Sequence, residues 1–81
     1  MNNILAIKVD GRTSNAVQVQ EILTKFGCNI KARVGFHEAG ADHCAMDGII
    51  ILQLFGDDDI AEGMRKELDK LDGVSPRMIE F

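Results

Sequence analysis

The sequence predicts an α+β fold with the element order strand, helix, strand, strand, helix, strand. Three observations support it. Apolar residues alternate with polar or small ones in expected strands, they recur at helical spacing in two longer segments, and turn residues such as Asp10-Gly11 and Asp72-Gly73 separate the segments. Two βαβ units with right-handed crossovers then form a four-stranded antiparallel sheet with both helices on one face, which is the ferredoxin-like arrangement.

The first half of the chain is expected to form a strand, a helix and a second strand. Residues 4–9 alternate with the period of a strand that is buried mainly on one face. A helix follows, because capable N-cap residues at 13–15 precede an apolar stripe that comprises Val19, Ile22, Leu23 and Phe26. Gly27 closes this helix. Residues 28–36 alternate strictly, so the second strand should have a polar face and an apolar face of Cys28, Ile30, Ala32, Val34 and Phe36.

The last part of the chain is expected to form a helix and a short strand. Residues 57–59 are three aspartates at the helix start, where the partial positive charge of the free amide groups favours carboxylates. The inward stripe of this helix comprises Ile60, Met64, Leu68 and Leu71. The tail from Val74 onward reads as a strand, and Pro76 places it at an edge because proline cannot donate to a ladder.

The third strand is apolar on both faces, which predicts self-association. One face carries Ile49, Ile51 and Phe55, and the other carries Ile50, Leu52 and Leu54. The first and third strands are central in this topology, and two helices can cover only one face of the sheet. An open apolar patch of this kind usually marks a protein interface, so we expect a homo-oligomer, either a dimer or a tetramer. The alternative is a monomer in which Lys8, Lys31 and Arg33 shield the patch.

Length and composition limit the class of protein. Eighty-one residues predict one domain, residues 1–81, with a small core. The hydrophobic content of 46% is ordinary, and no stretch approaches the roughly 20 apolar residues that cross a bilayer. No secretory signal is recognisable at the N-terminus, so a cytoplasmic location is expected. The net charge of −4, with nine scattered basic residues, argues against direct nucleic-acid binding.

Residues 9–36, VDGRTSNAVQVQEILTKFGCNIKARVGF, resemble the ACT regulatory domain, in which a strand ends in an Asp-Arg-Pro-Gly-like turn before a helix. Leu23, Gly27 and Asn29-Ile30 match the pattern that follows in that family. Over its whole length, and especially in ARVGF, GIIILQLFGDDDI and KLDGV, the chain resembles the small bacterial iron-only hydrogenase system regulators. These proteins are similar in fold to ACT domains and to the nickel-binding C-terminal domain of the nickel-responsive regulator. The resemblance implies an ACT-like fold and a regulatory role.

The likeness to ACT domains implies that small effectors, often amino acids, bind at a subunit interface near the turn after the first strand. The matching positions are Asp10, Gly11, Arg12, Thr13, Ser14 and Asn15. Amides at a helix start and hydroxyl groups bind carboxylates, and Arg12 could pair with one. Thr13-Ser14 or Ser14-Asn15 stands where the family has Pro-Gly. The alternative is a plain helix cap after a polar turn.

A metal site is the second candidate. His37, His43 and Cys44, with Asp42, supply ligands suited to a transition metal such as nickel or zinc, and a second chain could complete the shell. The nickel-binding relatives have a His-x-His pair and a cysteine at the start of the third strand, whereas this strand is expected to start at Gly48. No H-x-H or C-x-x-C spacing is present, so the alternative is a mobile hairpin loop without metal.

The pattern of polar residues does not predict an enzyme, because no Ser-His-Asp or Cys-His arrangement has a recognisable local signature. The leading hypothesis is a small regulatory or sensor module that binds an effector at a homo-oligomer interface and acts on another regulatory protein. The alternatives are a transition-metal sensor that uses the 37–44 loop and a structural interaction domain without a ligand.

Overall fold

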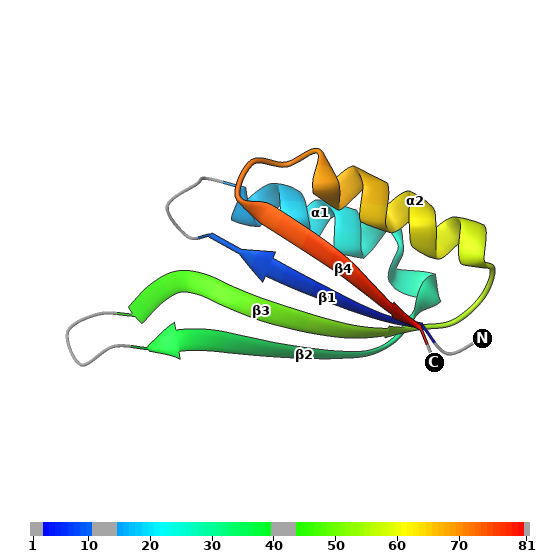
Figure 1. Ribbon diagram of the computed structural model, residues 1–81, viewed down its shortest axis with the longest axis horizontal. Helices are drawn as coiled ribbons and strands as arrows, with labels where there is room; N and C mark the ends of the chain where they lie inside the picture. The colour runs from blue at the N-terminus through cyan, green and yellow to red at the C-terminus, as the bar shows by residue number, and fades with distance from the viewer. Residues whose placement is uncertain (1–2, 11–14, 40–43, 81) are drawn as a thin grey trace.

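The computed structural model of the chain describes residues 3–10, 15–39 and 44–80, with only the backbone described at 3, 36–39 and 44–47. Four strands and two α-helices follow one another in the predicted order, which is strand, helix, strand, strand, helix, strand (Figure 1). A short 3-10 turn, η1, precedes the second strand. In chain order the elements are β1 (Asn3–Val9), α1 (Ala16–Lys25), η1 (Gly27–Asn29), β2 (Ile30–Ala39), β3 (Cys44–Leu54), α2 (Asp58–Asp69) and β4 (Val74–Glu80).

The strands form one antiparallel sheet in the order β2-β3-β1-β4. The α+β, ferredoxin-like topology predicted from the sequence is therefore confirmed, with β1 and β3 at the centre. The prediction that Pro76 lies in an edge strand is confirmed as well, since β4 is an outer strand and Pro76 stands opposite Ile7 of β1.

The core lies between one face of the sheet and the two helices, which both lie behind the sheet in Figure 1. The stripe predicted for α1 is confirmed, because Val19 and Leu23 are buried and Ile22 and Phe26 pack against the core. The stripe predicted for α2 is confirmed at Met64 and Leu68, but Ala61 is buried in place of Ile60, which is only partly buried. Leu71 packs against this core although α2 has already ended at Asp69. The sheet contributes Leu5, Ile7, Val9, Leu52, Leu54, Val74 and Pro76. Within the described ranges no helix is long and apolar enough to cross a membrane.

The second strand differs from the prediction in its start and in its faces. Residues 27–29 form η1, so the strand begins at Ile30 and not at Cys28. The pairing with β3 then shifts between Ile30 and Ala32, which is the mark of a β-bulge. An extra residue in a strand reverses the alternation beyond it. Ile30 therefore packs against the helix-side core, while Ala32 and Val34 lie on the opposite face of the sheet.

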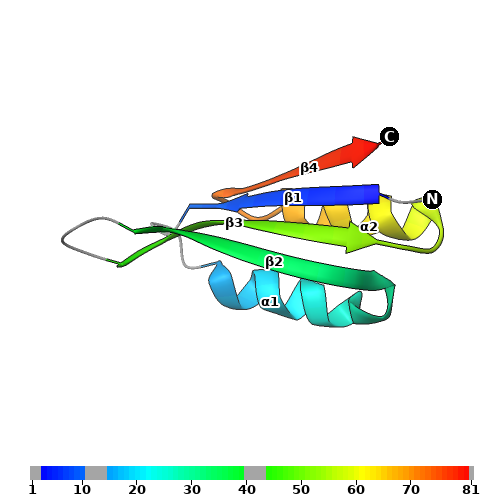
Figure 2. The same ribbon diagram turned by 90° about the horizontal axis from the view of Figure 1, so that it is seen from below.

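The hairpin between β2 and β3 is longer than the sequence predicts. β2 runs to Ala39 and β3 begins at Cys44, where the sequence analysis expected a loop and a strand start at Gly48. The paired strands extend past the ends of both helices (Figure 2). Antiparallel pairing is made by main-chain hydrogen bonds, so a polar, glycine-containing segment can extend a hairpin without an apolar alternation.

Candidate functional site

The face of the sheet opposite the helices is largely apolar, and no described element covers it. We call this surface the open face. It carries the residues that alternate with the buried ones: Ile4, Ala6, Lys8, Ala32, Val34, Ile49, Ile51, Gln53, Ser75, Arg77 and Ile79. Three of its large apolar side chains are well exposed, namely Val34 at 50%, Ile49 at 41% and Ile79 at 43%. The prediction that β3 is apolar on both faces is confirmed, because Leu52 and Leu54 are buried on its helix side.

Arginine shielding of the open face, the alternative considered for a monomer, is wrong at Arg33. Its Nη2 atom donates a hydrogen bond of 2.9 Å to Oε1 of Gln20, which lies on α1. Arg33 therefore lies on the helix side of the sheet. The bulge between Ile30 and Ala32 is the physical reason, because it turns Arg33 toward the helices and Val34 away from them.

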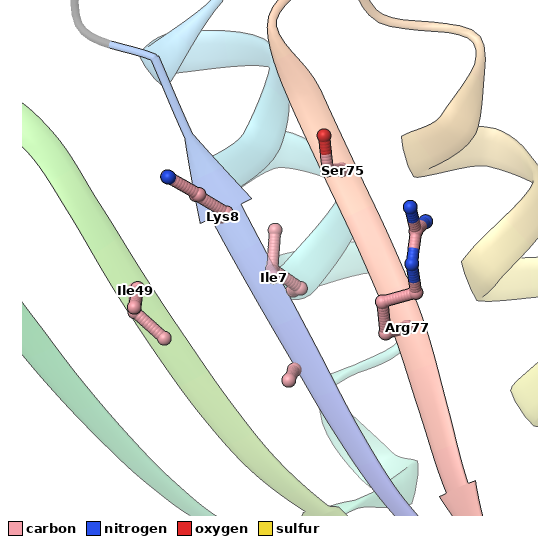
Figure 3. A pocket seen from close by; sticks show the side chains of 6 residues that line it. Ile7, Lys8, Ile49, Ser75 and Arg77 are labelled. Atoms are coloured by element: carbon pink, nitrogen blue, oxygen red, sulfur yellow. The ribbon is translucent and has the colours of Figure 1, made fainter.

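A shallow hollow of about 330 Å³ lies on the open face (Figure 3). It is lined by Ala6, Ile7, Lys8, Ile49, Ser75 and Arg77. Strand register brings these residues together: Lys8 stands opposite Ile49 on one side and Ser75 on the other, and Ala6 stands opposite Arg77. The hollow therefore spans three neighbouring strands, with β1 in the middle.

The hollow combines an apolar floor with cationic and hydroxyl groups at its border. Lys8 and Arg77 form no ion pair among the residues that the structure describes. Nη1 of Arg77 donates a hydrogen bond of 3.0 Å to the carbonyl oxygen of its neighbour Pro76, which leaves the other guanidinium hydrogens for a ligand. The two cationic groups lie on opposite sides of the hollow and point away from each other (Figure 3).

Only the two ends of the predicted effector turn are within the described residues. The backbone N–H of Asp10 donates a hydrogen bond of 2.7 Å to the carbonyl oxygen of Gly73. Asn15 occupies the position before α1, but its side-chain amide donates to the carbonyl oxygen of Asp72 and does not cap the helix. Both ends are thus tied to the turn before β4. The effector prediction for Gly11, Arg12, Thr13 and Ser14 falls outside the described residues.

The predicted metal ligands are placed only in part. His37 lies on β2 opposite Gly48, and Cys44 is the first residue of β3, opposite Ala39. Between these two pairs, one residue of β2 stands against three of β3, so the ladder is irregular there. His43 and Asp42 fall outside the described residues. Across the described part of the chain, no group of three or more His, Cys, Asp or Glu residues is arranged to hold a metal ion.

The sequence analysis missed the hollow. Period-2 alternation put Lys8 on the face opposite Ile7, but the alternation does not specify the register that brings Ser75 opposite Lys8 and Arg77 opposite Ala6. The available signal was the alternation of Ser75, Arg77 and Ile79 around the buried Pro76 in the last strand.

Comparisons with known proteins support the fold but do not assign an activity. No protein-family model matches the chain, and no curated protein matches it. Among solved structures, the chain is similar to the uncharacterized protein TM1266 from Thermotoga maritima. The two are 29% identical, the match covers 96% of this chain and 92% of that chain, and the TM-score is 0.82. The ferredoxin-like architecture is therefore shared over nearly the full length of both proteins.

Proposed function

We propose that the protein is a small regulatory or sensor module that self-associates through the open face and binds a small effector at the resulting interface. The observation that carries this proposal is the open face itself. Val34, Ile49 and Ile79 come from three different strands and are all exposed on one side of the sheet. Exposed apolar side chains that lie together on one face are typical of protein interfaces.

Burial of the open face would stabilise an assembly substantially. Each Å² of apolar surface removed from water contributes about 25 cal/mol. Standard interfaces bury roughly 800 Å² on each partner. Even a fraction of that area would contribute several kcal/mol, which is comparable to the about 5–15 kcal/mol of stability of a whole domain. Association would therefore matter to the stability of an 81-residue chain.

The regulatory role is proposed from the resemblance to the iron-only hydrogenase system regulators. An effector acts on such a module only if it binds one assembly state more tightly than another. The nine basic residues do not form one stripe along the sequence, so the proposed output is to another regulatory protein and not directly to DNA.

Two measurements test the proposal. Light scattering should report a mass of two or more times 8.9 kDa at micromolar concentrations. Isothermal titration calorimetry against amino acids, nucleotides and small carboxylic acids should detect at least one saturable ligand. A particle of 8.9 kDa at all concentrations would overturn the interface. A stable oligomer without any ligand would instead favour a structural interaction domain.

A transition-metal sensor is the second candidate, and the position of Cys44 favours it. Cys44 is the first residue of β3, and His37 lies on the paired strand β2, so both would be held by one hairpin. The nickel-binding relatives likewise use a cysteine at the start of the third strand. A symmetric partner would have to complete a four-coordinate shell.

Metal analysis separates this second candidate from the first. Protein purified without a chelating tag should contain about one nickel or zinc ion per chain if His37, His43 and Cys44 bind it. The triple variant His37→Ala, His43→Ala, Cys44→Ala should contain none and keep its oligomeric mass. Equal metal content in the two proteins would contradict the metal site.

A further inference from the structure

We infer that the outer edge of β2 is a docking site for an extended, acidic peptide segment of another protein, which would add a further strand to the sheet. The peptide would pair with the backbone of β2 and direct acidic side chains toward Arg33. Strand addition itself does not depend on the open face. That the peptide belongs to a regulatory partner rests on the proposed function, and the edge of β2 gives that partner a position.

The backbone of β2 is available for strand addition. Among the described elements, β2 is an outer strand that pairs with β3 alone (Figure 1). The pairing is regular from Ala32 to His37, between the two register shifts. In an antiparallel strand, alternate residues direct both the N–H and the C=O group away from the paired neighbour. This edge therefore presents a row of backbone donors and acceptors, and extended peptides bind to such edges.

The other outer strand, β4, is less suited to strand addition. It contains Pro76, which has no N–H group, so one backbone donor is missing from this strand. Proline within an outer strand is one of the features by which proteins prevent further pairing. β2 contains no proline. The bulge and Lys31 interrupt only the start of β2, before the regular stretch. An added strand is therefore expected at β2.

Both faces of β2 leave space for the side chains of an added strand. Residues 31–35 are all exposed. Ala32 and Val34 lie on the open face, and Arg33 lies on the helix side. Gly35 is the next residue on the helix side, and a Cβ atom there would meet no atom within 4 Å. One set of side chains of the added strand would thus lie beside the apolar residues, and the alternate set beside Arg33.

The charge of the edge favours an acidic partner. Residues 30–35 include two cations, Lys31 and Arg33, and no acidic residue, although the chain has a net charge of −4. Lys31 forms no ion pair within the described residues, and Arg33 donates to the neutral amide of Gln20. Pairing this stretch with the same stretch of a second copy would bring four cations together, and like charges on paired strands are destabilising. A strand that alternates acidic and apolar residues would complement both faces of β2.

Titration of the ¹⁵N-labelled full chain with the acetylated and amidated peptide Thr-Glu-Val-Glu-Val-Glu-Thr tests the site. We expect saturable amide shifts at residues 32–35 and slower hydrogen exchange at alternate amides of this stretch. Two matched peptides carry lysine in place of each glutamate or proline in place of each valine, and both should bind at least tenfold more weakly. The substitution Arg33→Glu should raise the dissociation constant at least tenfold, and Lys31→Glu should also raise it.

Lys70→Glu is the control, because it makes the same change of charge at an exposed residue at the end of α2. It should leave the dissociation constant unchanged. The proposal is overturned if no saturable shifts occur at residues 32–35, if the lysine peptide binds as tightly as the glutamate peptide, or if Lys70→Glu weakens binding as much as Arg33→Glu. It is also overturned if hydrogen exchange at residues 32–35 slows with protein concentration in the absence of peptide, because a second copy would then occupy the edge.

Light scattering on the same samples distinguishes the failure of this site from the failure of the proposed function. Saturable peptide binding to a chain of 8.9 kDa would support the docking site and contradict association through the open face. A larger particle that does not bind the glutamate peptide would overturn the docking site and leave the open-face interface standing.

Discussion

At the scale of single residues, Gly56 shows how one backbone conformation connects β3 to α2. Its φ is +105°, a region that residues with a side chain rarely adopt. A Cβ atom at this position would lie 2.7 Å from Nδ2 of Asn29. That amide donates a hydrogen bond of 3.2 Å to the carbonyl oxygen of Phe55, and the backbone N–H of Phe55 donates one of 3.0 Å to the carbonyl oxygen of Asn29. Gly56 therefore permits the contact that joins η1 to the end of β3.

We predict that Gly56→Ala destabilises the protein by about 1–2 kcal/mol, since it strains the backbone and displaces the Asn29 amide. Urea unfolding monitored by circular dichroism measures the change. Gly35→Ala is the control, because a Cβ at Gly35 meets no atom within 4 Å and φ is not positive there. Equal stability of the Gly56→Ala variant and the wild type would show that this contact contributes little.

Residue types alone did not predict the hollow on the open face. The effector site was predicted at 10–15 from the resemblance to a family, and of these residues the structure describes only Asp10 and Asn15, which are hydrogen-bonded to the turn before β4. Arg77 and Ser75 could not be predicted, since they come from the other end of the chain. Only the strand register places them beside Lys8.

At the scale of elements, α2 is the best-predicted segment, because its acidic start and two residues of its apolar stripe, Met64 and Leu68, agree with the structure. Asp57 precedes the helix, Asp58 and Asp59 lie in its first turn, and its buried residues follow helical spacing. β2 is the least well predicted. Its alternation was read correctly, but the bulge that exchanges its two faces depends on pairing with β3, which a single strand sequence does not specify.

The exposed side of α2 carries an ion pair that predicts a pH effect. Nη2 of Arg65 lies 2.6 Å from Oε1 of Glu62, and this hydrogen bond, with a smaller effect from the charge of Lys66, lowers the pKa of Glu62 below its ordinary value of 4.5. A lowered pKa means that the pair stabilises the fold above the unfolded pKa. The contribution is lost as the pH falls through the folded pKa.

We therefore predict that Arg65→Gln raises the pKa of Glu62, measured from the side-chain carboxyl ¹³C shift during an acid titration. Lys66→Gln should raise this pKa less, because the Arg65 hydrogen bond is the larger cause. An unchanged titration of Glu62 in the Arg65→Gln protein would mean that the ion pair does not form in solution.

At the scale of the whole molecule, the sequence predicted the topology because local pattern and chain order agree. Six segments with clear periods, joined as two βαβ units, leave few arrangements other than the observed sheet order. The pattern of one chain does not predict what covers the open face, because no described element of the chain packs on it. On β3, Leu52 and Leu54 complete the core on the helix side, whereas Ile49 on the other side is 41% exposed.

The open face gives a prediction with a matched pair of valines. Val34 is 50% exposed on the open face, and Val17 is 65% exposed on α1. If the open face is the interface, Val34→Lys places a charge in its apolar surface and should reduce the mass toward 8.9 kDa, whereas Val17→Lys should not. The thermal midpoint of the wild type should also rise with protein concentration, because assembly stabilises the folded chain by mass action, and this dependence should vanish in Val34→Lys only. Light scattering and a concentration series of thermal scans measure both effects. Equal behaviour of the two variants would mean that any association uses a surface other than the open face.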